Sequence, residues 1–166
     1  RDVAFADTEI PLPHGHSMLA PNVVGRILQA IDLQGPESVL EIGTGSGYLS
    51  ACLAQLASRV RSIEIVPEIA SLARDNLKAA EITGIEVLDG DGLRYGDDKQ
   101  YDAIAVTASM PLYEPHFEQL LAPGGRLFVV VGNEAPMEAR LVRRDAAGKL
   151  STTSLFETLL EPLLNA

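Results

Sequence analysis

The chain contains the segment Val39-Leu40-Glu41-Ile42-Gly43-Thr44-Gly45-Ser46-Gly47-Tyr48, in which a short apolar run leads into three alternating glycines. The apolar run predicts a buried strand over residues 38–42, and the apolar spacing after Tyr48 predicts a helix. Glycine allows a tight turn and lets the backbone approach a ligand closely. The start of the helix adds unpaired N–H groups and a partial positive charge. The segment therefore predicts a ligand-binding loop at the carboxyl end of a first strand.

Two acidic residues near this loop indicate what kind of ligand it holds. The spacing G-x-G-x-G differs from the dinucleotide fingerprint G-x-G-x-x-G. Glu41 lies two residues before Gly43, where a carboxylate suits an amino group or a sulfonium and disfavours a pyrophosphate. Glu64 ends a second predicted strand, where it can accept hydrogen bonds from both hydroxyls of a ribose. A tight turn beside a surface acid is the structural alternative, but the agreement of strand, loop, helix and acid favours ligand binding.

Short apolar runs alternate with helical spacing along most of the chain. Strands are predicted over 38–42, 60–65, 85–88, 103–106 and 126–131, and helices over 23–31, 49–56 and 69–80. A further short helix over 117–121 is predicted to stop at Pro123-Gly124-Gly125. This alternation is typical of parallel strands joined by right-handed crossovers. Residues 140–144 and 154–160, joined through a turn at 146–149, predict a final antiparallel hairpin.

Length and composition predict a single domain over residues 1–166. The net charge of −10, from 13 basic and 23 acidic side chains, disfavours nucleic acid as a partner. No apolar run approaches the roughly 20 residues that a membrane helix needs, and the N-terminus lacks the apolar region of a signal peptide. A single cysteine, Cys52, fits a reducing compartment, so we expect a cytoplasmic protein without a membrane partner. The chain begins with Arg1, which leaves open a preceding segment, and the oligomeric state is open as well.

Two more stretches suit a nucleoside-like ligand. Asp89-Gly90-Asp91-Gly92 follows the third predicted strand, where Asp91 can accept a hydrogen bond from an adenine amino group. A turn rich in Asp and Gly is the structural alternative for this stretch. Thr107 follows the fourth predicted strand, on the side that faces a ligand in this architecture.

Taken together, these motifs resemble the class I S-adenosylmethionine-dependent methyltransferases. The resemblance rests on Glu41-x-Gly43-x-Gly45-x-Gly47, Glu64, Asp91-Gly92 and Leu121-x-Pro123-Gly124-Gly125. More narrowly, the chain is similar to the protein-L-isoaspartate O-methyltransferase family in residues 39–48, 90–92, 101–104 and 106–108, and in Phe156 with Glu161-Pro162-Leu163. The resemblance implies a doubly wound, Rossmann-like methyltransferase sheet, mostly parallel, with a C-terminal antiparallel hairpin.

The resemblance also implies an activity. This family transfers a methyl group from S-adenosylmethionine to the carboxylate of L-isoaspartyl residues in damaged proteins, as a step of repair, and leaves S-adenosylhomocysteine. A carboxylate is already a nucleophile at neutral pH, so positioning and exclusion of water suffice. Isoaspartyl-containing peptides or proteins are then the expected partners. The cofactor contacts that the resemblance implies are Glu41, Gly43, Thr44, Gly45, Gly47, Tyr48, Glu64, Ile65, Asp91, Gly92 and Thr107.

The N-terminal loop, residues 1–21, departs from the family. The family reads approximately Leu-Pro-Ile-Gly-x-Gly-Gln-Thr-Ile-Ser-x-Pro there, and its serine contacts the reacting carboxylate region. The matching residues here are His16 for glutamine, Ser17 for threonine and Leu19 for serine, which makes these three the catalytic candidates. Leucine cannot donate a hydrogen bond. Either Ser17 or His16 substitutes, or the acceptor is a small molecule, or the chain is a non-catalytic relative that binds cofactor.

His14 and His16 form the pair that could suggest a metal site. A third ligand with suitable spacing does not accompany them, since His116 lies far along the chain. We therefore expect no metal.

Overall fold

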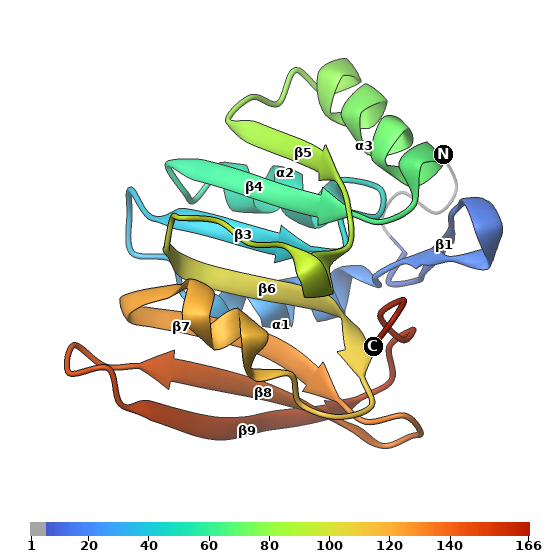
Figure 1. Ribbon diagram of the computed structural model, residues 1–166. Helices are drawn as coiled ribbons and strands as arrows, with labels where there is room; N and C mark the ends of the chain where they lie inside the picture. Colours follow the sequence, from blue (N-terminus) through green and yellow to red (C-terminus); the bar gives the residue numbers. More distant parts are fainter. Residues whose placement is uncertain (1–5) are drawn as a thin grey trace.

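The computed structural model describes residues 6–166, which form one large β-sheet with a small ribbon beside it (Figure 1). The strand order is β5-β4-β3-β6-β7-β8-β9. The strands are β3 (Ser38–Ile42), β4 (Arg59–Glu64), β5 (Ile85–Asp89), β6 (Tyr101–Met110), β7 (Leu121–Val131), β8 (Met137–Arg144) and β9 (Leu150–Thr158). Neighbours from β5 to β7 run parallel, whereas β7, β8 and β9 pair antiparallel. The predicted mostly parallel sheet with a C-terminal antiparallel hairpin is confirmed.

Three α-helices pack on the sheet, namely α1 (Pro21–Ile31), α2 (Tyr48–Ala54) and α3 (Pro67–Ala79). In Figure 1, α1 and α2 lie behind the sheet, and α3 lies beside β5. Proline starts α1 and α3, because its fixed φ suits the first turn and its missing N–H would have had no partner there. The helix predicted over 49–56 is too long. The chain leaves α2 after Ala54 to enter β4, and Leu56 beyond it is 49% exposed.

The opposite face is covered by loops and two 3-10 helices, η2 (Gly92–Arg94) and η3 (Pro115–Leu120). Phe117 of η3 is fully buried and belongs to the core cluster that includes Leu40, Ile104 and Leu127. The connections from β5 to β6 and from β6 to β7 run through this layer. The sheet is therefore wound on both faces, with α-helices on one side and shorter elements on the other.

The prediction that Pro123-Gly124-Gly125 stops a helix is wrong. η3 already ends at Leu120, and Leu121 belongs to β7. The pairing of β6 with β7 shifts register at this point, so β7 forms a bulge. A side chain at Gly125 would come within 2.8 Å of the carbonyl oxygen of Ala122. The glycines thus allow β7 to bulge. A Pro-Gly-Gly sequence is equally compatible with the end of a helix, so the sequence alone did not distinguish the two.

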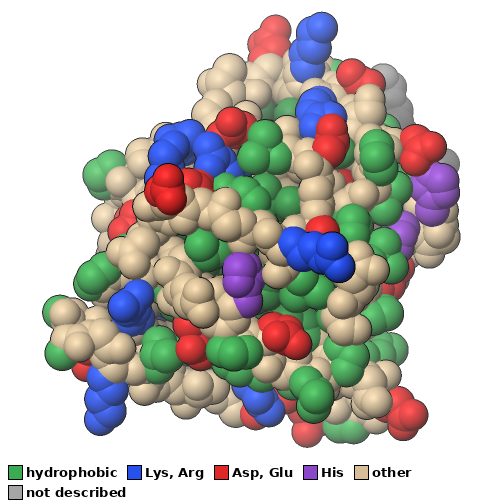
Figure 2. Space-filling model, viewed as in Figure 1, with side chains coloured by type: hydrophobic (Ala, Val, Ile, Leu, Met, Phe, Trp, Pro, Cys, Tyr) green, Lys and Arg blue, Asp and Glu red, His purple; other side chains and the backbone are tan. Residues whose placement is uncertain are grey.

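The surface carries both charges. On the face shown in Figure 2, Lys and Arg side chains lie among Asp and Glu side chains. Two arginines of β8 have partners within the protein, since Arg140 pairs with Glu138 and Arg144 donates to the carbonyl oxygen of Leu121. Among residues 6–166, no helix is both long enough and apolar enough to span a bilayer.

A buried arginine ties α1 to the sheet. Arg126 of β7 is 5% exposed and donates to the carbonyl oxygens of Ile31 and Asp32 at the end of α1. Its guanidinium also forms a two-pronged ion pair with Glu37, at 2.5 and 2.8 Å. This pair lowers the pKa of Glu37. Arg126 therefore joins the end of α1, the segment before β3 and the centre of the sheet.

Replacing Arg126 by Met should lower the free energy of unfolding by about 3 kcal/mol, because Glu37 and two helix carbonyls would lose their shared partner. Arg143→Met is the matched control, since Arg143 pairs opposite Arg126 on β8 but is exposed. Urea unfolding followed by circular dichroism measures both variants. The deficit of the Arg126 variant should shrink as the pH falls and Glu37 becomes protonated, because the pair contributes only while this carboxylate is ionised. Equal losses in the two variants would contradict this role.

Candidate functional site

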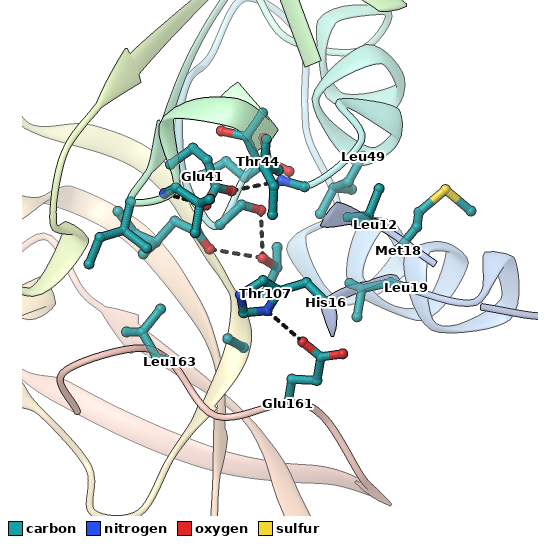
Figure 3. Close-up of a pocket in the computed structure, with 18 of the residues that line it drawn as sticks. Leu12, His16, Met18, Leu19, Glu41, Thr44, Leu49, Thr107, Glu161 and Leu163 are labelled. Atoms are coloured by element: carbon teal, nitrogen blue, oxygen red, sulfur yellow. Dashed lines mark hydrogen bonds and ion pairs between the residues drawn. The ribbon is translucent and has the colours of Figure 1, made fainter. Parts of the chain in front are cut away.

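A pocket lies at the carboxyl ends of β3, β4 and β6 (Figure 3). Its walls are the glycine loop after β3, the turn after β5, the N-terminal ribbon and residues 160–164 of the C-terminal tail, which comprises residues 160–166. The ribbon consists of β1 (Ile10–Pro11) and β2 (Ser17–Met18), joined through the 3-10 turn η1 (Pro13–Gly15). All predicted site residues except Gly47 line this pocket: His16, Ser17, Leu19, Glu41, Gly43, Thr44, Gly45, Tyr48, Glu64, Ile65, Asp91, Gly92 and Thr107.

Neighbouring elements hold the glycine loop in shape. Gly43 has a φ of +94°, and a side chain there would collide with the hydroxyl of Thr107 on β6. That hydroxyl lies 2.9 and 2.7 Å from the carbonyl oxygens of Ile42 and Gly43. Gly47 has a φ of +84° and packs against Leu77 of α3 instead of lining the pocket. Gly43 therefore permits the close approach of β6, whereas Gly47 permits the packing of α3.

Glu41 is completely buried at the base of the pocket. One of its oxygens, Oε2, accepts hydrogen bonds from Ser50 and, at 2.7 Å, from Ser62. The other, Oε1, is buried without a hydrogen-bond partner among residues 6–166. Burial raises the pKa of this carboxyl to about 7. A buried oxygen without a partner costs stability. The arrangement thus indicates a ligand that brings a cation or a hydrogen-bond donor to Oε1.

Glu64 links the end of β4 to the glycine loop. Its Oε2 accepts from the backbone N–H of Gly45 at 3.0 Å, and its Oε1 accepts from that of Val66 at 3.1 Å. The side chain is buried yet lines the pocket. A carboxylate has about four acceptor sites, so each oxygen keeps capacity for a ligand hydroxyl. Beside it, Thr44 is held by a hydrogen bond of 2.6 Å with Ser62.

Asp91 lies in the turn after β5, and its carboxylate already accepts hydrogen bonds within the protein. Its Oδ1 accepts from the backbone N–H of Leu93, and its Oδ2 lies 3.2 Å from Nδ2 of Asn165 in the C-terminal tail. Gly92 is buried against Ile42 of β3, where a side chain would collide. The turn is therefore pressed against the end of β3, which brings Asp91 into the same pocket as the glycine loop.

The N-terminal loop places its three catalytic candidates on one wall. His16 lines the pocket, and its Nδ1 lies 2.9 Å from Oε2 of Glu161 (Figure 3). Ser17 lies in β2, and Leu19 lines the pocket while packing against the core beneath α1. His14 instead pairs with Glu68 at the start of α3. Within the described residues, no three His, Cys, Asp or Glu side chains gather as a metal site.

The C-terminal tail is the part of the site that sequence reasoning missed. Leu160, Glu161 and Leu163 line the pocket. The tail is fixed to β6, because the N–H of Ser109 donates to the carbonyl oxygen of Glu161 and the carbonyl oxygen of Ser109 accepts from the N–H of Leu163, at 2.8 and 2.7 Å. β6 is longer than the predicted 103–106, which makes this pairing possible. The signal available was the stretch Glu161-Pro162-Leu163, which carries part of the resemblance to the family but was given no role in the site.

Comparison with known proteins gives a consistent result. The whole chain, residues 1–166, matches the family model for protein-L-isoaspartate(D-aspartate) O-methyltransferase. A protein-L-isoaspartate O-methyltransferase from Methanoculleus marisnigri is 41% identical over 165 residues, which cover 98% of this chain and 74% of the relative. One from Myxococcus xanthus is 42% identical over 161 residues, covering 96% of this chain and 76% of the relative.

Solved structures share the fold at lower identity. A Plasmodium falciparum protein assigned as a protein-L-isoaspartate O-methyltransferase, crystallised with S-adenosyl-L-homocysteine, superposes with a TM-score of 0.86 at 20% identity, covering 100% of this chain and 84% of that one. A second protein-L-isoaspartate O-methyltransferase superposes with a TM-score of 0.80 at 23% identity, covering 90% and 49%. The match of the family model over the full chain, together with relatives above 40% identity, shows that this chain belongs to the protein-L-isoaspartate O-methyltransferase family.

Proposed function

We propose that this chain uses S-adenosylmethionine to methylate the carboxylate of L-isoaspartyl residues in damaged proteins, with S-adenosylhomocysteine as product. The observation that carries the proposal is the buried Oε1 of Glu41, which has no hydrogen-bond partner in the described part of the chain and lies in the pocket beside the glycine loop. Membership of the family supports the choice of acceptor, since the relatives above are named for this reaction.

The pocket residues fit this cofactor. Glu41 offers its free oxygen to the cationic end, which bears an amino group and a sulfonium. Glu64 has acceptor capacity left for the ribose hydroxyls, and Asp91 lies where an adenine amino group can donate to it. We assign these three acids to the positive end, the ribose and the adenine, in that order along the pocket.

When bound, S-adenosylmethionine supplies a methyl group on a positively charged sulfur. The acceptor carboxylate is ionised at neutral pH, so the protein need not remove a proton from it. Thr107 is no candidate base, because its hydroxyl is held by two backbone carbonyls. The contribution of the chain is to bring the reactants into line and exclude water, for which Leu12, Met18 and Leu163 provide an apolar wall (Figure 3).

Two alternative functions rest on Leu19. Its apolar side chain occupies the position at which the family has a serine, and Leu12 and Met18 line the same pocket. Such a wall suits a small apolar acceptor molecule. A leucine that cannot donate a hydrogen bond would also fit a relative that binds the cofactor without turnover. The cofactor assignment is common to all three functions, so only the acceptor distinguishes them.

Incubation with radiolabelled S-adenosylmethionine and an isoaspartyl peptide should place base-labile label on that peptide and leave the matching aspartyl peptide unlabelled. Base lability identifies a methyl ester, and the aspartyl peptide controls for non-specific carboxyl methylation. Binding of S-adenosylhomocysteine should be measured in parallel by calorimetry. Protein that binds this product but labels neither peptide would refute the isoaspartyl assignment and favour the small-molecule or non-catalytic function.

Glu41→Gln should affect stability and cofactor affinity in opposite directions. The raised pKa means that folding opposes ionisation of Glu41, so the unliganded wild type loses stability as the pH rises from about 4.5 to about 7. Glutamine cannot ionise, so the variant should lack this loss. Its affinity for S-adenosylmethionine should nevertheless fall about tenfold or more at pH 8, because a charge-assisted contact is removed.

Thermal unfolding across pH and calorimetric titration measure the two effects of this substitution. Glu157→Gln, at an exposed position on β9, is the matched control and should change neither. Unchanged cofactor affinity in the Glu41 variant would show that Oε1 does not face the cationic end of the ligand.

A further inference from the structure

The charged side chains that line the pocket are predominantly acidic. Among the described residues that line it are the five acids Glu9, Glu41, Glu64, Asp91 and Glu161, with no Lys or Arg. His16 is the one side chain among them that can carry a positive charge. An acceptor carboxylate entering this acidic pocket would be repelled unless a cation met it. The bound cofactor brings its sulfonium to the acceptor, while its amino group is assigned to Glu41. Among the described residues that line the pocket, only His16 can add a further positive charge on the acceptor side.

Glu161 holds His16 from the C-terminal tail. Its Oε2 lies 2.9 Å from Nδ1 of His16, and its backbone is fixed to β6 through the N–H of Ser109. Ser109 is 1% exposed, and its hydroxyl lies 3.2 Å from the carbonyl oxygen of Leu160. In Figure 3 the ring of His16 lies between Glu161 and Thr107. The tail thus sets the ring near the end of β6, where the acceptor must meet the cofactor.

This contact defines what the other nitrogen can do. A carboxylate only accepts, so Nδ1 of His16 must donate to Glu161. Within residues 6–166, Nε2 makes no hydrogen bond. An acceptor carboxylate at Nε2 would place the imidazole between two negative charges, which favours the imidazolium with both nitrogens donating. Glu161 therefore prepares His16 to bind a second carboxylate.

We propose that His16, positioned by Glu161, binds the carboxylate of the isoaspartyl acceptor through Nε2–H. This inference rests on the proposed function and names the residues of its acceptor side. The hydrogen bond goes to the oxygen that is not methylated, since donation to the attacking oxygen would weaken it as a nucleophile. Methylation neutralises the carboxylate, so the ester loses its attraction to the imidazolium and dissociates. His16 is then the catalytic residue that touches substrate, and Glu161 is a positioning residue.

If the pair of His16 and Glu161 were purely structural, its only effect would be to hold the N-terminal ribbon against the C-terminal tail. The same loop supplies a comparison, because His14 pairs with Glu68 at the same distance of 2.9 Å but neither residue lines the pocket. Variants of the two pairs therefore separate anchoring of the loop from recognition of the acceptor.

The test measures binding of an isoaspartyl peptide and of its methyl ester to protein saturated with S-adenosylhomocysteine, by calorimetry. His16→Gln keeps a neutral donor and should raise the Kd of the carboxylate peptide about tenfold, the difference between a charged and a neutral hydrogen bond. Glu161→Gln should act in the same direction, and the double variant should be no worse than His16→Gln alone, because the two residues act as one unit. Affinity for the ester and for S-adenosylhomocysteine should stay unchanged in all three, as should peptide affinity in His14→Gln.

Kinetics provide a second readout and separate this inference from the proposed function. His16→Gln should raise KM for the isoaspartyl peptide more than it lowers kcat, because most of the lost contact is already made before transfer. Equal effects of His14→Gln and His16→Gln, or weakened binding of S-adenosylhomocysteine, would overturn the inference and make the pair an anchor. An active wild type with an unaffected His16 variant overturns this inference alone, whereas a wild type that labels no isoaspartyl peptide overturns both.

Discussion

The pocket depends on the glycine loop after β3, which is held in place by residues at the ends of the two neighbouring strands, β4 and β6. Thr107 from β6 packs on Gly43, and Glu64 from β4 accepts the N–H of Gly45, so the loop after β3 is held from both sides. Parallel strands make this possible because their carboxyl ends meet at the same edge of the sheet. Ala108, the residue after Thr107, also lines the pocket. Displacing the loop would therefore disturb cofactor and acceptor together.

One residue of the pocket lowers the stability of the unliganded fold, whereas a buried network elsewhere in the sheet raises it. Glu41 is buried with one oxygen that has no partner among residues 6–166, an arrangement that a domain selected only for stability would avoid. Arg126, in contrast, satisfies Glu37 and two helix carbonyls in one buried network. The first feature becomes favourable only with a ligand, whereas the second acts in the unliganded protein. Such a division is expected when a binding site is prepared in advance on a rigid sheet.

The two halves of the pocket have different origins in the chain. The proposed cofactor half comes from the ends of the central strands and carries the motifs on which the resemblance to the family rests. The proposed acceptor half comes from the N-terminal ribbon and the C-terminal tail, which meet through His16 and Glu161. It is in this half that Leu19 departs from the family. The ribbon and the tail lie outside the seven-stranded sheet, and segments outside such a scaffold vary more readily than its strands, so the proposed acceptor side can vary while the proposed cofactor side is kept.

Local patterns in the sequence determined the strand–loop–helix unit, the parallel sheet and its final hairpin, because glycine spacing and apolar periodicity act within a few residues. They also singled out Glu41, Glu64 and Asp91 as pocket acids. Only the tertiary structure decided that Gly47 serves packing, that Gly125 permits a bulge, and that Ser50 and Ser62 hold one oxygen of Glu41 and leave the other free. The same holds for His16 and Glu161, which are separated by 145 positions in the chain. No periodicity relates residues so far apart. The N-terminal ribbon places His16, and the pairing of the tail with β6 brings Glu161 to it.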